Sequence, residues 1–109
     1  MEQKFREHPN FNTNNFINMG IQYLFIFENG YGASVVCHSS SYGGHEGLYE
    51  LAVLFDDYLC YDTEITDDVL GWLTVEDVLK TLERIKELKK PNPTAIGKGT
   101  ISNKNTRTE

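Results

Sequence analysis

Residues 22–37 read QYLFIFENGYGASVVC, and this stretch decides how the rest of the chain is interpreted. The runs QYLFIFE (22–28) and YGASVVC (31–37) are rich in aromatic and β-branched residues, as β-strands are. Between them stands Asn29-Gly30, a dipeptide that favours a type I′ turn, in which both central residues have a positive φ. The stretch therefore predicts a β-hairpin.

Two more strands are expected after this hairpin. In LYELAVLF (48–55) one alternating set of residues is wholly apolar and the other mostly so, which is typical of a strand with a buried face. Asp56-Asp57 has the residue types of a tight turn. Behind it, YLCYD (58–62) is expected to form a short fourth strand.

A short helix is expected over residues 67–72, DDVLGW, because Thr66 can cap its start and two acids favour the first turn. Trp72 is expected to pack, with Leu70 and Leu73, between this helix and the sheet.

A longer helix is expected over residues 75–89. Thr74 and Asp77 have the spacing of a capping box, apolar residues repeat at helical spacing, and Pro91 stops the helix. The element order predicts an α+β fold: an antiparallel β-meander of three to four strands, a short helix, and a C-terminal helix packed on one face.

The 109 residues are enough for one domain. Residues 1–20 are polar and Asn-rich and are expected to form an N-terminal arm that lays one or two aromatic residues on the core. Residues 21–90 form the expected α+β domain, and 91–109 a flexible tail. The chain has no apolar run of transmembrane length and no signal-peptide pattern, so we expect a cytoplasmic protein with Cys37 and Cys60 reduced.

Charge is distributed unevenly along the chain. Residues 7–79 contain twelve acids and no Lys or Arg, whereas residues 80–109 contain eight basic residues and three acids. Most protein surfaces intersperse both signs, so this body predicts a negative potential that repels nucleic acid and is attracted to a basic groove. The residues expected to bind such a partner are Asp56, Asp57, Asp62, Glu64, Asp67 and Asp68.

Residues 38–47, HSSSYGGHEG, contain residue types that carry out chemistry, but their pattern favours a glycine-rich connection. A zinc site using His38 and His45 with Cys37 and Cys60 is disfavoured, because neighbours on a strand point to opposite faces. The serines lack the nucleophile elbow G-x-S-x-G, the glycines lack the lysine of a phosphate-binding loop, and DTEITDD (62–68) lacks the calcium-binding spacing of an EF-hand.

We therefore expect no catalytic residue, no metal and no cofactor. Tyr42, in the middle of this loop, is the expected aromatic anchor for a partner.

Four segments resemble small, uncharacterised proteins encoded by bacteriophages and prophages: NGYGASVV (29–36), SYGG (41–44), GLYELAVL (47–54) and LCYDTEITDDVLGWL (59–73). The resemblance covers residues 22–88 and departs at Glu64, where those proteins have a proline after the triplet YDT. It implies an inhibitor of host nucleic-acid machinery or of host defence, a group that includes anti-CRISPR proteins.

The leading hypothesis is a non-catalytic inhibitor whose acidic surface occupies a basic groove of a host protein, for example a CRISPR effector, in place of nucleic acid. The acidic body is then expected to bind neither nucleic acid directly nor a membrane. The alternative is a protein–protein adaptor, with homodimerisation left open, that acts through a sheet edge or the hairpin face. A third hypothesis is a small enzyme centred on His38 and His45.

Overall fold

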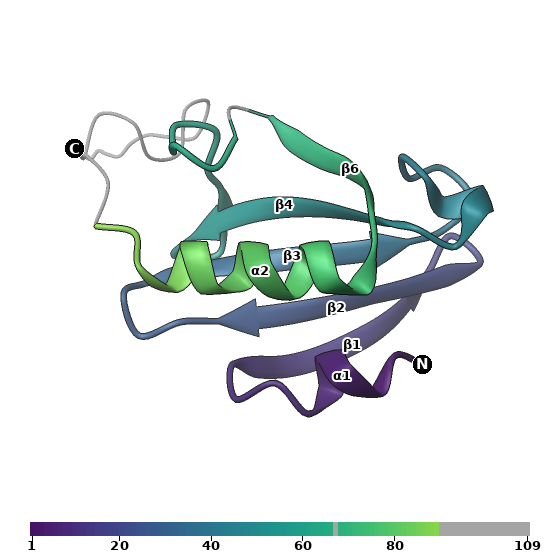
Figure 1. Cartoon of the computed structure of the whole chain (residues 1–109), viewed down its shortest axis with the longest axis horizontal. Coiled ribbons are helices and arrows are strands. Elements are labelled where there is room, and N and C mark those ends of the chain that lie inside the picture. The colour runs from purple at the N-terminus through teal and green to yellow at the C-terminus, as the bar shows by residue number, and fades with distance from the viewer. Residues whose placement is uncertain (67, 90–109) are drawn as a thin grey trace.

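The computed structural model describes residues 1–66 and 68–89 as one curved antiparallel sheet with a helix across one face (Figure 1). Five strands are neighbours in chain order: β1 (Phe11–Ile17), β2 (Gly20–Ile26), β3 (Tyr31–Cys37), β4 (Tyr49–Phe55) and β5 (Tyr58–Leu59). A sixth strand, β6 (Val69–Leu73), pairs with the same edge of β4 as β5 does. The α+β class is confirmed, but the sheet has more strands than the three to four expected.

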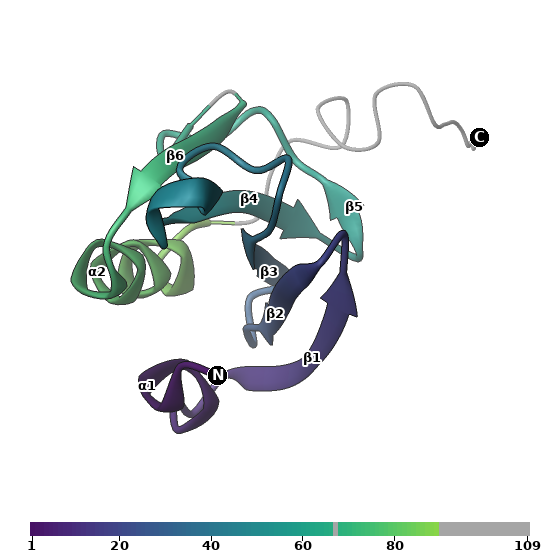
Figure 2. The same ribbon diagram turned by 90° about the vertical axis from the view of Figure 1, so that its right-hand side faces the viewer.

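The helix α2 (Val75–Lys86) covers one face of the sheet (Figure 2). Its apolar stripe of Val78, Leu82 and Ile85 is fully buried, as helical spacing predicts. The capping box is present: the Asp77 amide donates to Thr74 Oγ1 (3.1 Å), and the Thr74 amide donates to Asp77 Oδ2 (3.0 Å). These hydrogen bonds lower the pKa of Asp77, because they favour its charged form. The predicted C-terminal helix is therefore confirmed, although it ends three residues earlier.

Asn29 ends this helix and does not form the predicted type I′ turn. Its side-chain amide donates to the carbonyls of Ile85 (2.9 Å), Lys86 (3.1 Å) and Leu88 (3.0 Å). In the turn itself only Gly30 has a positive φ, 92°, so the hairpin closes through a three-residue loop of Glu28, Asn29 and Gly30. The turn geometry differs from the prediction because the asparagine side chain donates to carbonyls at the end of α2.

Residues 1–20 form α1 (Gln3–Arg6) and β1 in place of the expected arm. Phe5 is completely buried, and its ring meets those of Tyr23 (5.0 Å between centroids) and Tyr49 (4.9 Å) edge to face. The amide of Glu2 also donates to the Tyr23 hydroxyl (2.7 Å). The segment is polar in sequence because most of its side chains face outward, and a few apolar contacts hold it in place.

The short helix predicted over 67–72 is wrong, because Val69–Leu73 form the strand β6. Without β6, the part of β4 that β5 does not reach would leave backbone groups unpaired. Leu51 of β4 pairs with Leu70 and Tyr49 with Leu73, so tertiary pairing overrides the local capping signal. The expected fourth strand is shortened to β5, and the loop after it buries Cys60 and Ile65.

None of the helices in the described part of the chain is long and apolar enough to span a bilayer. The predicted tail at 91–109 and the predicted site residue Asp67 lie outside the described residues.

The Asn29→Ala variant tests the helix cap. We expect it to lower the free energy of unfolding by about 1 kcal/mol, because partly buried and exposed carbonyls at the end of α2 lose the donor that Asn29 provides. Urea denaturation measures this change. The neighbouring exposed substitution Glu28→Ala is the control, with an expected change below about 0.5 kcal/mol. Equal unfolding midpoints for the two variants would contradict the cap.

The Phe5→Ala variant tests whether the N-terminal segment belongs to the core. Removing this fully buried ring should cost about 3–5 kcal/mol, because it empties space between Tyr23 and Tyr49. The matched control is Phe16→Ala, which makes the same chemical change at a ring that is 76% exposed. A Phe5→Ala variant as stable as Phe16→Ala would show that the segment is not part of the folded unit.

Candidate interaction surfaces

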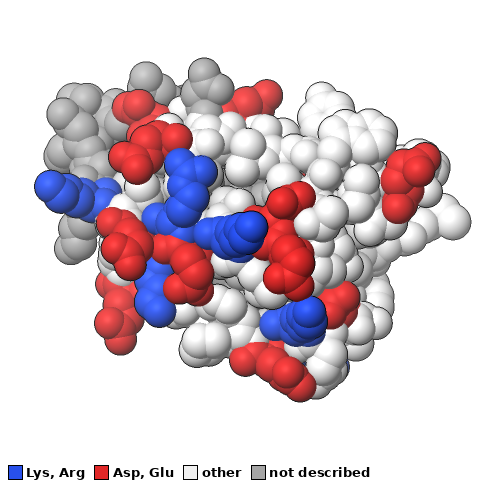
Figure 3. Space-filling view, viewed as in Figure 1, with Lys and Arg blue, Asp and Glu red and all other residues white. Residues whose placement is uncertain are grey.

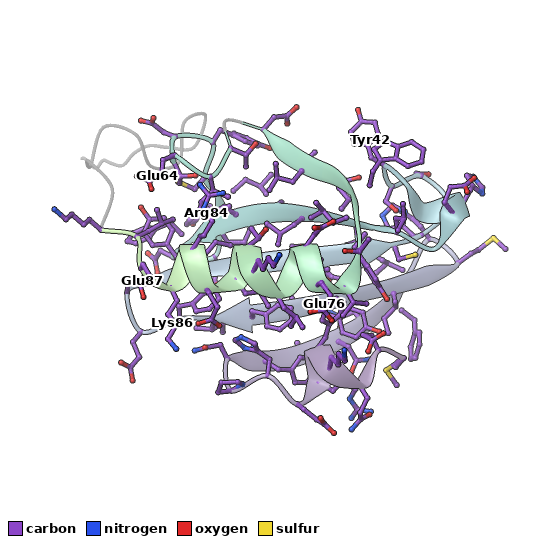
Figure 4. All side chains as sticks on the ribbon, in the orientation of Figure 1. Tyr42, Glu64, Glu76, Arg84, Lys86 and Glu87 are labelled. Atoms are coloured by element: carbon purple, nitrogen blue, oxygen red, sulfur yellow. The ribbon has the colours of Figure 1, made fainter. Side chains whose placement is uncertain are left out.

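The structure divides the predicted partner-binding residues among three places. Asp56 and Asp57 form the turn between β4 and β5, and Asp62 and Glu64 lie in the loop between β5 and β6. Asp68 immediately precedes β6, and Tyr42 lies at the other end of the molecule from Glu64 (Figure 4). The fold therefore places four of the predicted residues at one end of the molecule, whereas Tyr42 lies at the other end.

The four carboxylates flank Tyr31, the first residue of β3. Asp56 and Asp57 line a hollow of about 540 Å³ on the sheet face opposite α2. Asp62 and Glu64 line a second hollow of about 450 Å³ beside the end of α2, and Tyr31 lines both hollows. We call this region the acidic end; its six exposed acids are Glu28, Asp56, Asp57, Asp62, Glu64 and Glu87.

Basic residues of α2 and its C-terminus reduce the negative potential at the acidic end, contrary to the expectation that few cations lie nearby. Arg84 and Lys89 line the same hollow as Asp62 and Glu64, and Arg84 rises from α2 on the side of the loop that carries Glu64 (Figure 4). Lys86 lies 3.8 Å from Glu83. Both signs are therefore interspersed over α2 (Figure 3). The six acids still outnumber Arg84 and Lys89 by four charges.

Tyr31 is buried at this end and lines both hollows. Its hydroxyl donates to the carbonyl of Lys89 (2.8 Å). Burial raises the pKa of Tyr31, and the charge of Asp62 adds to the rise, because a nearby anion disfavours a tyrosinate. The hydroxyl thus remains a hydrogen-bond donor between the two hollows.

The opposite end exposes two aromatic residues, Tyr42 and Trp72. The loop after β3 contains the short 3₁₀ helix η1 (Gly44–Glu46) and holds Tyr42 by its backbone. The Tyr42 amide donates to Glu50 Oε1 (2.8 Å), and its carbonyl accepts from the Trp72 amide (3.2 Å). Tyr42 is 59% exposed and Trp72 60%. In Figure 3 the upper right of the molecule, where Tyr42 lies, is mostly uncharged.

Trp72 is exposed because β6 contains a bulge. Between the pairs Tyr49–Leu73 and Leu51–Leu70, β4 has the single residue Glu50, whereas β6 has both Gly71 and Trp72. Trp72 takes a φ of +58°, which is unusual for a bulky residue. The expected packing cluster is therefore correct for Leu70 and Leu73 but wrong for Trp72.

Sequence reasoning missed Trp72 as a surface residue, because it predicted a helix where a bulged strand forms. The dipeptide Gly71-Trp72 was the available signal, since an isolated glycine in a strand often marks a bulge. A Cβ at Gly71 would lie only 2.5 Å from the Cβ of Tyr42, so glycine is required where the loop crosses β6.

The polar side chains of residues 38–47 mainly stabilise their own loop. Ser41 Oγ accepts from the His38 amide (2.9 Å) and donates to the His38 carbonyl (3.1 Å), while His38 Nδ1 accepts from the Ser40 amide (3.1 Å). Burial raises the pKa of the Cys37 thiol, whose Sγ donates to the Gly44 carbonyl (3.6 Å). Within residues 1–66 and 68–89, His, Cys, Asp and Glu nowhere gather in a group of three or more that could hold a metal.

No protein family model, curated protein or solved structure matches this chain.

Two substitutions of Trp72 test the strained bulge. In the left-handed region alanine is less favourable than glycine, so we expect Trp72→Gly to be more stable than Trp72→Ala by about 1 kcal/mol. Chemical denaturation measures the difference. At Tyr58, an exposed strand residue with an ordinary φ, the same two substitutions should give the reverse order. Alanine favoured at both positions would mean that Trp72 is not strained in solution.

Proposed function

We propose that the protein is a non-catalytic inhibitor, of the phage type, that binds a nucleic-acid-handling or defence protein of the host. Its acidic end occupies a groove lined by Lys and Arg, for example in a CRISPR effector, and competes there with nucleic acid. The site of action is the host cytoplasm. The observation that carries this proposal is that Asp56 and Asp57 line one hollow, Asp62 and Glu64 line a second, and Tyr31 lines both.

The geometry supports binding by electrostatic attraction. All six carboxylates of the acidic end are exposed, so they can approach a basic groove without a conformational change. Complementary charge mainly raises the association rate and selects the partner. Because Arg84 and Lys89 also lie there, a groove with its own scattered carboxylates can match this end better than a uniformly basic one.

The loop that contains His38 and His45 supports a binding function over a catalytic one. A serine nucleophile needs a histidine side chain as its base, but the Ser41 hydroxyl is bonded to the backbone of His38. The proposal accordingly involves no cofactor and no metal.

A protein–protein adaptor is the second candidate function, and the exposed pair Tyr42 and Trp72 favours it. Tyrosine and tryptophan are enriched among the residues that contribute most to protein interfaces. A strained, exposed tryptophan is costly to keep, and such strain clusters at ligand-binding positions. This surface lies at the opposite end from the acids, so variants can test the two functions separately.

Capture from a bacterial host lysate tests the inhibitor function. A tagged chain should retain a basic protein in about 50 mM salt, lose most of it in about 500 mM salt, and release it to duplex DNA, because screening and a competing polyanion both weaken charge pairing. The double variant Asp62→Lys with Glu64→Lys should reduce capture at least about tenfold.

The matched control is Glu46→Lys, which reverses one exposed acid at the other end and should leave capture intact. Capture that survives high salt, DNA and the double reversal contradicts the inhibitor function. If that capture is instead lost in Trp72→Ala, the adaptor function is supported.

A further inference from the structure

We propose that two copies of this chain form a symmetric dimer in which β1 pairs antiparallel with β1 of the second copy. This inference is independent of the acidic end and goes beyond the proposed inhibitor function.

The outer edge of β1 is open for pairing. Among the strands that the structure describes, β1 pairs with β2 alone, and it forms the outer margin of the sheet in Figure 2, with α1 lying on the α2 side. Alternate residues of an edge strand turn their N–H and C=O groups away from the neighbouring strand, so β1 presents a row of unpaired backbone groups. A second strand would satisfy them.

β1 lacks most of the features that protect sheet edges from pairing. Proteins usually place lysine, other charges or proline on such strands. Residues 9–27 contain no Asp, Glu, Lys or Arg, and β1 itself has no proline. A bulge at Asn12 interrupts the start of β1, but residues 13–17 pair with β2 in continuous register. The opposite margin of the sheet, by contrast, has Asp56, Asp57 and Asp68 beside it.

The uncharged character of β1 favours a second copy as its occupant. The chain has a net charge of −6, so two copies repel each other unless they meet along a segment without charge. Two copies of one strand that pair antiparallel are related by a two-fold axis, because residue i of one copy faces residue j of the other and the reverse also holds. A basic protein would find no carboxylate along this strand.

Exposed apolar side chains at the end of β1 support the same conclusion. Phe16 is 76% exposed, and Met19 in the turn to β2 is 98% exposed. Together with Met1 they line a shallow hollow of about 470 Å³. Strand pairing across β1 would remove the Phe16 ring from water, which apolar burial favours.

Light scattering after size exclusion tests the dimer. The full chain should have the mass of one chain at about 10 µM and approach twice that mass at about 500 µM, as mass action requires. Phe16→Lys places a charge on the edge and should keep the mass of one chain at both concentrations. The control Tyr61→Lys changes an exposed aromatic residue in the β5–β6 loop and should dimerise like the original chain.

Amide hydrogen exchange at the two concentrations shows where the copies meet. The expected result is slower exchange at the higher concentration for alternate amides of β1, with no change at Tyr42 or Trp72. A mass of one chain at every concentration overturns the proposal. A dimer that persists in Phe16→Lys, or one without added protection in β1, also overturns it. The acidic end takes no part, so these outcomes leave the inhibitor function unaffected.

Discussion

The pairing of β4 is the constraint on which much of the structure depends. β3 covers one edge of β4 along its length, while β5 and β6 must share the other edge. The chain between β5 and β6 therefore forms a long loop, although both strands pair with the same edge of β4. This loop buries Cys60 and Ile65 and leaves Asp62 and Glu64 exposed. Because β5 and β6 share one edge of β4, the loop between them carries Asp62 and Glu64, two of the acids of the acidic end.

The same constraint determines the opposite end. β6 contains one more residue than β4 can pair, and the resulting bulge turns Trp72 out of the sheet. The loop after β3 then packs across Gly71 and holds Tyr42 next to this tryptophan. The two ends of β4 consequently differ: one gathers carboxylates, and the other exposes aromatic rings on a mostly uncharged surface (Figure 3).

Elements with strong periodicity could be predicted from the sequence, whereas those stabilised by distant contacts could not. The spacing of apolar residues predicts the buried faces of β2, β3, β4 and α2. The cap formed by Thr74 and Asp77 is a local motif that the sequence also reveals. Phe5 lies in the core because it meets Tyr49, 44 residues along the chain, and no local pattern reports such a contact. The charge pattern indicated which residue types are charged at the surface, but only the fold places Arg84 in the same hollow as Asp62 and Glu64.

The bond between Asn29 and the end of α2 has a consequence for how the chain folds. Most strand pairs join neighbours in sequence, which close quickly because the intervening loops are short. The Asn29 amide reaches carbonyls 56 to 59 residues away, so this closure must wait until the helix lies on the meander. The end of the helix therefore rests on a tertiary contact as well as on the local sequence there.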